Sequence, residues 1–200
     1  MSPKTVILMG RSGSGKGTQG ALLEANLEAR DGREVFYFEA GAKFREFVAK
    51  ESYSGKLAAQ IMDQGLLLPS FFPVWNWANN FINHLTGEEH IIVDGGLRLL
   101  GEAIMFEEAL QFYQRSDVIF IYLNVTSEEA AKRLGLRGRH DDISAEKIKN
   151  RMGWFDKDVL PVIEYFKTRP NVTFIEIDGN PAIETVTSSI MKSLESYLND

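Results

Sequence analysis

Hydrophobic residues occur in five short runs, and stretches with helical spacing lie between and after them. The runs cover residues 4–9, 34–39, 89–94, 117–124 and 172–177. The third contains Ile91, Ile92 and Val93 in succession, which is typical of a strand that is buried on both faces. Helical patterns cover residues 19–30, 41–51, 54–64, 70–85, 99–114, 144–167 and 181–198, and Thr126 caps one more helix. This alternation predicts an α/β fold with three layers, in which helices cover a five-stranded parallel sheet.

Two segments depart from a simple alternation of strands and helices. Residues 41–85 are too many for one crossover, so we expect them to form a small helical insert. Residues 136–142 are polar and arginine-rich, which predicts a short connecting loop. The helix over 144–167 is expected to bend near Pro161. We expect these segments and the remainder of the chain to form a single domain, residues 1–200.

Composition excludes several classes of protein. The chain has no cysteine, so disulfides and thiolate-bound zinc are excluded. The net charge of −6 argues against a general nucleic-acid-binding protein. No apolar run reaches the ~18 residues of a membrane span, and the start of the chain lacks a signal-peptide pattern. We therefore expect a cytoplasmic protein that binds neither nucleic acid nor membrane.

A glycine-rich loop joins the first strand to the first helix. Loops of this kind direct backbone N–H groups at phosphate oxygens, and the helix that follows adds partial positive charge. Lys16 supplies a full positive charge for the outer phosphates. The sequence therefore predicts a phosphate-binding loop made of Gly13, Ser14, Gly15, Lys16, Gly17 and Thr18.

A single carboxylate ends the third strand. Ligands of open parallel sheets gather outside the carboxyl ends of the strands. Asp94 occupies such an end and can hold water molecules around a Mg²⁺ ion that bridges ATP phosphates. An aspartate that only caps the turn at Gly95 is the structural alternative.

Six arginines lie in the predicted insert, at the end of the third strand, and in the polar connection with its flanking helices. Any one of them alone would more often be a surface residue, but guanidinium groups bind phosphate bidentately and stay charged. A convergent set in an acidic protein suggests a site for several phosphates, which phosphoryl transfer between two nucleotides requires. The set comprises Arg45, Arg98, Arg133, Arg137, Arg139 and Arg151.

Together these motifs resemble the adenylate kinases, within the nucleoside monophosphate (NMP) kinase family. The match covers nearly the whole chain and includes the loop at 13–19, Ala40-Gly41 with Arg45, the strip 65–69, the run 94–98 and Asp178-Gly179-Asn180. The resemblance implies a P-loop kinase fold, with residues 41–85 as an NMP-binding insert and 136–142 as a very short lid. It implies Mg²⁺-dependent phosphoryl transfer from ATP to AMP, by a monomer.

The resemblance also implies a role for each site residue. The implied catalytic residues are Lys16, Arg98, Arg137, Arg139 and Arg151. The loop at 13–18 would bind ATP together with Arg133, Arg137 and Asn180. Asp94 would hold the metal through water. The acceptor nucleotide would meet Ala40, Gly41, Arg45, Leu66, Leu67, Leu68, Gly95, Arg98, Glu102, Arg139 and Arg151.

Three departures from the family pattern leave the acceptor and the turnover open. Ala42 stands where an Asp is usual, Gly96-Leu97 replaces Phe-Pro, and Glu102 replaces Gln or Asn. A Gln can donate to N1 of adenine and accept from its amine, whereas an ionised Glu only accepts. A UMP/CMP kinase or a GMP kinase is therefore an alternative to an adenylate kinase. A nucleotide-binding regulator without turnover is an alternative of another class.

Overall fold

The computed structural model describes residues 2–115, 117–138 and 145–198. Its five strands form one parallel sheet in the order β2-β3-β1-β4-β5. The strands are β1 (Thr5–Gly10), β2 (Val35–Glu39), β3 (His90–Asp94), β4 (Val118–Asn124) and β5 (Val172–Asp178). Each lies within a residue or two of its expected range, so the five-stranded parallel sheet is confirmed.

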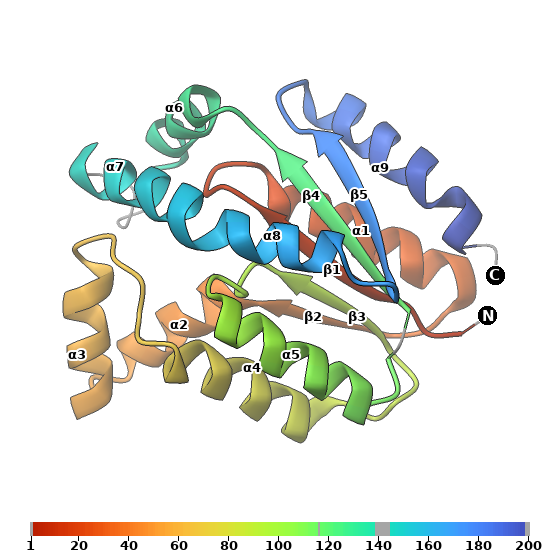
Figure 1. Ribbon diagram of the computed structural model, residues 1–200, viewed down its shortest axis with the longest axis horizontal. Helices are drawn as coiled ribbons and strands as arrows, with labels where there is room; N and C mark the ends of the chain where they lie inside the picture. The colour runs from red at the N-terminus through yellow and green to blue at the C-terminus, as the bar shows by residue number, and fades with distance from the viewer. Residues whose placement is uncertain (1, 116, 139–144, 199–200) are drawn as a thin grey trace.

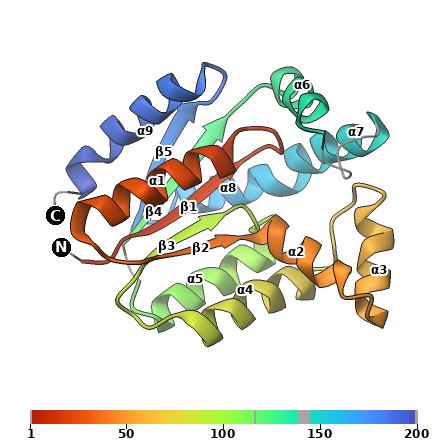
Figure 2. The same ribbon diagram turned by 180° about the vertical axis from the view of Figure 1, so that it is seen from behind.

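Helices cover both faces of this sheet (Figures 1 and 2). Of the helices, α1 (Lys16–Asp31) and α9 (Ile183–Leu198) pack on one face, and α4 (Phe71–His84), α5 (Leu100–Phe112) and α8 (Leu160–Lys167) on the other. The alternation of side chains in β1 explains how: Val6 and Leu8 join the core under α1 and α9, while Ile7 and Met9 join the core under α4, α5 and α8. The three-layer α/β architecture is thus confirmed.

The segment expected as a helical insert contains α2 (Ala40–Ala49), α3 (Tyr53–Met62) and α4. A small separate core holds α2 and α3 to the start of α4, where Phe47 and Phe72 meet edge to face. Farther along α4, Trp77 and Phe81 enter the main core against Phe106 of α5. The aromatic residues of this region therefore serve two cores.

The long helix expected near the C-terminus is interrupted as predicted. It consists of α7 (Ala145–Trp154), the π-helical turn η2 (Phe155–Val159) and α8. Pro161 has no N–H and its ring collides with the carbonyl four residues earlier, so the ordinary hydrogen-bond ladder cannot continue. The Leu160 N–H instead donates to the Phe155 carbonyl, which is the longer π-type bond. The remaining helix, α6 (Ser127–Arg137), starts after Thr126, whose side chain caps it as expected.

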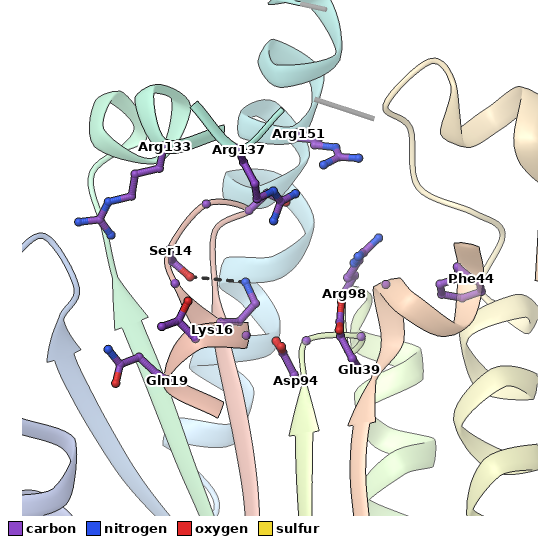
Figure 3. Close-up of a pocket in the computed structure, with 18 of the residues that line it drawn as sticks. Ser14, Lys16, Gln19, Glu39, Phe44, Asp94, Arg98, Arg133, Arg137 and Arg151 are labelled. Atoms are coloured by element: carbon purple, nitrogen blue, oxygen red, sulfur yellow. Dashed lines mark hydrogen bonds between the residues drawn. The ribbon is translucent and has the colours of Figure 1, made fainter. Parts of the chain in front are cut away.

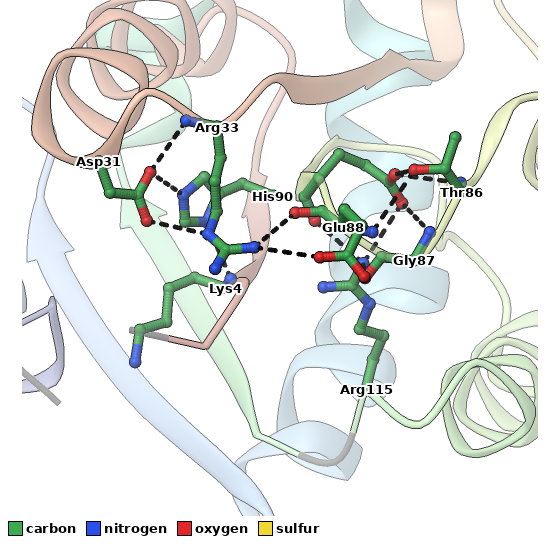
Figure 4. A network of polar contacts seen from close by, with 9 residues as sticks. Lys4, Asp31, Arg33, Thr86, Gly87, Glu88, His90 and Arg115 are labelled. Carbon is green, nitrogen blue, oxygen red and sulfur yellow. Dashed lines mark hydrogen bonds and ion pairs between the residues drawn. The ribbon is translucent and has the colours of Figure 1, made fainter.

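The two ends of the sheet differ in character. At the carboxyl ends of the strands lies a pocket lined by charged residues (Figure 3). At the amino ends of the strands, a network of polar contacts joins Lys4 and the turn after α1 to the loops before β3 and after α5 (Figure 4). Within the described ranges, no helix is long and apolar enough to cross a membrane.

A buried ion pair lies at the centre of the network. Arg115 donates to the Glu89 carboxylate at 3.3 Å and to the carbonyls of Gly87 and Glu89 at 3.1 and 2.9 Å. Burial opposes the charge of Glu89, but hydrogen bonds from Thr86 and Gly87 outweigh it and hold the pKa of the Glu89 carboxyl below its usual range. The stabilisation that Glu89 provides is therefore complete above its unfolded pKa, and it is lost as the pH falls through the lowered folded value.

A neighbouring histidine in this network has a structural role. The backbone N–H of Lys4 donates to Nδ1 of His90, so the ring proton lies on Nε2 and faces the Asp31 carboxylate at 3.1 Å. Arg33 binds the same carboxylate. Because both ring nitrogens are satisfied in a buried position, His90 fixes the start of β1 and carries no chemistry.

Removing the arginine tests how much the ion pair contributes. In Arg115→Met the Glu89 carboxylate loses its buried partner, and we expect a loss of about 3 kcal/mol in the free energy of unfolding at neutral pH, measured by chemical denaturation. Lys43→Met, which breaks the exposed pair with Glu46, is the control and should change it by about 0.5 kcal/mol or less. Equal effects in the two variants would contradict a stabilising role for the buried pair.

Candidate active site

The pocket has a volume of about 770 Å³ and is lined by residues from most of the chain. The loop between β1 and α1 forms its floor, and the turns after β2 and β3 form one side (Figure 3). Helices α6 and α7 and the segment before α9 supply the other walls. The pocket thus lies where the rule for open parallel sheets places a ligand.

The glycine-rich loop has the geometry that phosphate binding needs. Gly15 caps α1 with a left-handed φ of 92°, so the chain turns sharply and the first N–H groups of α1 face the pocket. The Gln19 amide donates to the Ile183 carbonyl at 3.1 Å, which ties the helix to the far wall. The residues from 13 to 18 all line the pocket, as the sequence predicted.

Lys16 lies across the mouth of this loop. Its ammonium group donates to the carbonyls of Gly10 and Arg11 at 2.8 and 3.0 Å. Burial lowers the pKa of Lys16 to about 8, the nearby Asp94 carboxylate opposes this effect, and the charges of Arg98 and Arg137 add to it. A bound anion would remove this repulsion, so the site is electrostatically built for negative charge.

Three arginines converge on the space above Lys16. Arg137 ends α6, Arg151 comes from α7, and Arg98 rises from the turn after β3 (Figure 3). Burial lowers the pKa of Arg98, and the charge of Arg151 lowers it further, whereas Glu102 raises it. Arginine side chains that line one pocket favour the binding of an anion there. The convergence that the sequence suggested is therefore seen for these three residues.

Two carboxylates face the loop from adjacent strands. Asp94 and Glu39 are partners in the register of β3 and β2, and both line the pocket. The Tyr37 hydroxyl donates to Asp94 at 3.1 Å, while Glu39 binds Arg45 at 2.9 Å. Burial, together with the carboxylate of Asp94, raises the pKa of Tyr37, so its hydroxyl keeps the proton and continues to donate.

The comparisons with known proteins agree with this geometry. The family model described as adenylate kinase matches residues 8–171. An adenylate kinase of Prochlorococcus marinus (strain MIT 9515) is 31% identical over 192 residues, covering 96% of this chain and 98% of the relative. One from Trichodesmium erythraeum (strain IMS101) is 30% identical, with 95% and 97% covered, and adenylate kinase 1 of a Synechocystis strain is 28% identical, with 94% and 96% covered.

The chain belongs to the adenylate kinase family. The resemblance noted in the sequence is confirmed, and with it a P-loop kinase fold and a transferase that acts on nucleoside monophosphates. The pocket has two walls that come from different parts of the chain. One wall contains Arg133 and the segment 179–183, and the opposite wall contains the insert and Glu102.

The wall next to α6 is held together by one arginine. Arg133 donates to the carbonyls of Gly179 and Asn180 at 2.9 and 2.8 Å and pairs with Glu129 at 2.8 Å. Asn180, expected to bind ATP, does not line the main pocket, because its side chain bonds to the backbone of Thr126 and to Asp178. Gly179 and Pro181 line the pocket on either side of it.

The opposite wall contains most of the residues expected around the acceptor. Ala40 is buried beneath Gly96 and does not reach the pocket. Arg139 lies outside the described residues, as does most of the expected lid at 136–142. The expected residues that do line this wall are Gly41, Arg45, Leu66, Leu67, Leu68, Gly95, Arg98, Glu102 and Arg151.

Glu102 is fully buried at the base of this wall. One carboxylate oxygen accepts the Arg98 backbone N–H at 2.9 Å, and the other, Oε1, has no hydrogen-bond partner. Burial raises the pKa of Glu102 to about 7, against the opposing effects of that hydrogen bond and of the Arg98 charge. A carboxyl group with this pKa is partly protonated at neutral pH, so Oε1 can donate as well as accept.

The sequence did not point to several residues that shape the site. Glu39 and Tyr37 lie in a strand that contains no motif, and Trp154 reads as an ordinary helical residue. Arg11, at the start of the loop between β1 and α1, pairs with Asp156 at 2.6 Å and stacks on Phe155. Only an acidic residue at a strand end, as at Glu39, gave a usable signal.

A substitution of Lys16 tests the electrostatic interpretation in two ways. We expect Lys16 to stabilise the charge of the transferred phosphoryl group, so Lys16→Met should lower turnover by about 10²-fold or more. The lowered pKa means that the buried ammonium opposes folding below pH 8, an effect that fades as the pH rises toward the unfolded pKa. The ligand-free variant should therefore unfold at no lower temperature than the parent protein at pH 7, measured by calorimetry. Near-normal turnover would contradict the role given to Lys16.

Proposed function

We propose that this chain is an adenylate kinase that transfers a phosphoryl group reversibly from ATP to AMP and forms two ADP. The observation that carries the proposal is the convergence of Lys16, Arg98, Arg137 and Arg151 on one pocket between two different walls. A site that only bound one nucleotide would not need positively charged groups from both walls. Membership of the adenylate kinase family supports the same reaction.

The two walls suggest how the substrates lie. ATP would place its phosphates on the loop at 13–18, with its base toward Arg133 and the segment 179–183. AMP would lie on the opposite side, with its phosphate between Arg45 and Arg98 and its base toward Glu102 and residues 66–68. Arg45 would then exchange the carboxylate of Glu39 for the phosphate of AMP. Both phosphates would meet above Lys16.

The reaction needs charge stabilisation more than proton transfer. An oxygen of the AMP phosphate attacks the γ-phosphorus of ATP in line, the bond to the bridging β-phosphate oxygen breaks, and ADP leaves as an anion. The attacking oxygen is already anionic, so a general base is unnecessary. Lys16, Arg98, Arg137 and Arg151 would neutralise the charge that spreads over the transferred group, and we include Arg139 in this set from the sequence.

The residues present fit a magnesium ion held through water. The family generally uses ATP with Mg²⁺. Among the described residues, no group of three or more acidic, His or Cys side chains could form a closed metal cage. Mg²⁺ usually binds one or two carboxylates and substrate phosphates and retains its waters, which suits Asp94 and the hydroxyl of Thr18 at this end of the sheet. When bound, the ion would neutralise part of the negative charge of the ATP phosphates.

Both walls of the pocket come from a single chain, and this supports a monomeric enzyme with small nucleotides as its partners. Placement in the cytoplasm remains a prediction from the sequence.

An acceptor panel tests the proposed reaction. With ATP and Mg²⁺, we expect ADP formation to have its highest kcat/KM with AMP, compared with CMP, UMP and GMP, in a coupled assay. Preference for another acceptor would make the chain a different NMP kinase. If no acceptor raises ADP formation above the background of Lys16→Met, the chain is a nucleotide-binding regulator and the proposal fails.

Glu102 allows a sharper test of how AMP is selected. The protonated Oε1 would donate to N1 of adenine, whereas the ionised carboxylate suits the N1–H of guanine. The AMP:GMP ratio of kcat/KM should therefore fall by about tenfold from pH 6 to pH 8, as a group with a pKa of about 7 loses its proton. Glu102→Gln keeps a donor and an acceptor at every pH, so its ratio should be flat and, at pH 8, about tenfold higher than that of the parent. Parallel pH profiles would show that this side chain does not select the base.

A further inference from the structure

Trp154 connects two parts of the acceptor wall that are distant in the sequence. It is the last residue of α7, and its indole ring lines the pocket. The Arg98 guanidinium lies 5.2 Å from the centre of this ring, within the range of a cation–π contact. The indole N–H donates to the Gly65 carbonyl at 3.0 Å. One side chain therefore contacts both the phosphate-binding arginine and the segment that leads into residues 66–68.

The hydrogen bond to Gly65 is one of several contacts between α7 and the turn after α3. Asn150 donates to the Gln64 carbonyl at 2.8 Å, and Lys147 pairs with Asp63 at 3.4 Å. Positions 147, 150 and 154 share one face of α7. They hold residues 63, 64 and 65 in succession, so this face of the helix fixes the entry to the acceptor strip.

The backbone geometry shows that the contact is close. Gly65 has a left-handed φ of 69°, and a Cβ atom at this position would lie 2.9 Å from the Lys147 carbonyl oxygen. Any other residue would push the turn away from α7. Glycine at position 65 therefore allows the turn after α3 to approach α7 more closely than any residue with a Cβ atom would.

The segment directly after α7 is anchored to the donor side. Directly after Trp154, Phe155 stacks under the Arg11 guanidinium at 4.3 Å and Asp156 pairs with Arg11 at 2.6 Å. Arg11 belongs to the loop that would carry the ATP phosphates. The position of Trp154 is therefore set from the donor side, while its contacts lie on the acceptor side.

We propose that Trp154 is a positioning residue that preforms the acceptor site, by stacking on Arg98 and by holding the Gly65 carbonyl. Arg98 benefits from such support, because burial and the charge of Arg151 lower the pKa of its guanidinium more than the charge of Glu102 raises it. The face of the indole supplies negative potential without offering an anion that would compete with the acceptor phosphate. Because Arg98 and residues 66–68 are fixed before AMP binds, binding costs less conformational entropy. This inference rests on the proposed assignment of the acceptor wall.

Substitutions at Trp154 separate the two contacts. Trp154→Phe keeps an aromatic face for Arg98 but removes the donor to Gly65, and Trp154→Leu removes both. We expect kcat/KM for AMP to fall by about threefold in the Phe variant and by about tenfold or more in the Leu variant, mainly through KM. The KM for ATP should stay within about twofold of the parent value. Trp75→Phe, a half-exposed residue on α4 outside the pocket, is the matched control and should change neither constant.

A spectroscopic measurement on the parent protein gives a second readout. The chain has three tryptophans, so its indole N–H groups give three resonances in a ¹H–¹⁵N spectrum, and the Phe variants at 154 and 75 identify two of them. Titration with AMP alone should shift the Trp154 resonance as Arg98 engages the phosphate, and should leave the Trp75 resonance in place.

The possible outcomes distinguish this inference from the proposed function. If the parent protein transfers phosphoryl groups to AMP but the Trp154 variants keep its KM, and the Trp154 resonance does not move, the positioning role is wrong and the function stands. If the Leu variant loses affinity for ATP and AMP equally, along with thermal stability, Trp154 only holds the fold and the inference is overturned. If AMP binds nowhere and no acceptor is used, the proposed function itself fails.

Discussion

One electrostatic feature dominates this protein: among the described residues that line the pocket, positive side chains outnumber negative ones, and Lys16 at the centre is desolvated. Lys16 lies at the start of α1, whose dipole adds to the field, and Arg98 and Arg137 lower its pKa further. Such an arrangement opposes folding. It persists because two large hydrophobic cores, one on each face, stabilise the surrounding sheet. A multiply charged phosphate ligand relieves the repulsion, so the same feature that destabilises the ligand-free protein drives nucleotide binding.

This feature also explains why the positively charged groups need support from their neighbours. An arginine near other arginines does not hold its position by itself, and three arginines of the site show what fixes them. Arg133 is held by two backbone carbonyls and a glutamate, Arg45 by Glu39, and Arg98 by the face of Trp154. The pocket is therefore preorganised, which is where electrostatic stabilisation of a transition state gains its advantage over water.

Helix α7 and the π turn η2 connect the two halves of the site. Arg11 in the loop stacks on Phe155, and the adjacent Trp154 reaches the acceptor wall. The π turn arises from Pro161 in the next helix, so a backbone restriction remote from the chemistry sets the direction in which these two aromatic side chains point. Three consecutive residues, 154–156, therefore contact both halves of the site.

The succession of strands and helices along the chain, the glycine-rich loop and the family could all be read from the sequence, because they depend on local periodicity and on motifs with fixed spacing. It placed Asp94 and most of the arginines at the correct edge, since the carboxyl ends of parallel strands must meet there. The pairing of side chains became clear only in the folded protein. Asn180 turns to the backbone of Thr126, Ala40 is buried beneath Gly96, and Glu102 accepts the Arg98 backbone N–H with one oxygen while the other has no partner. Trp154 carries no motif, and its role arises from contacts with Arg98 and Gly65, which are far from it in the chain and which no local pattern encodes.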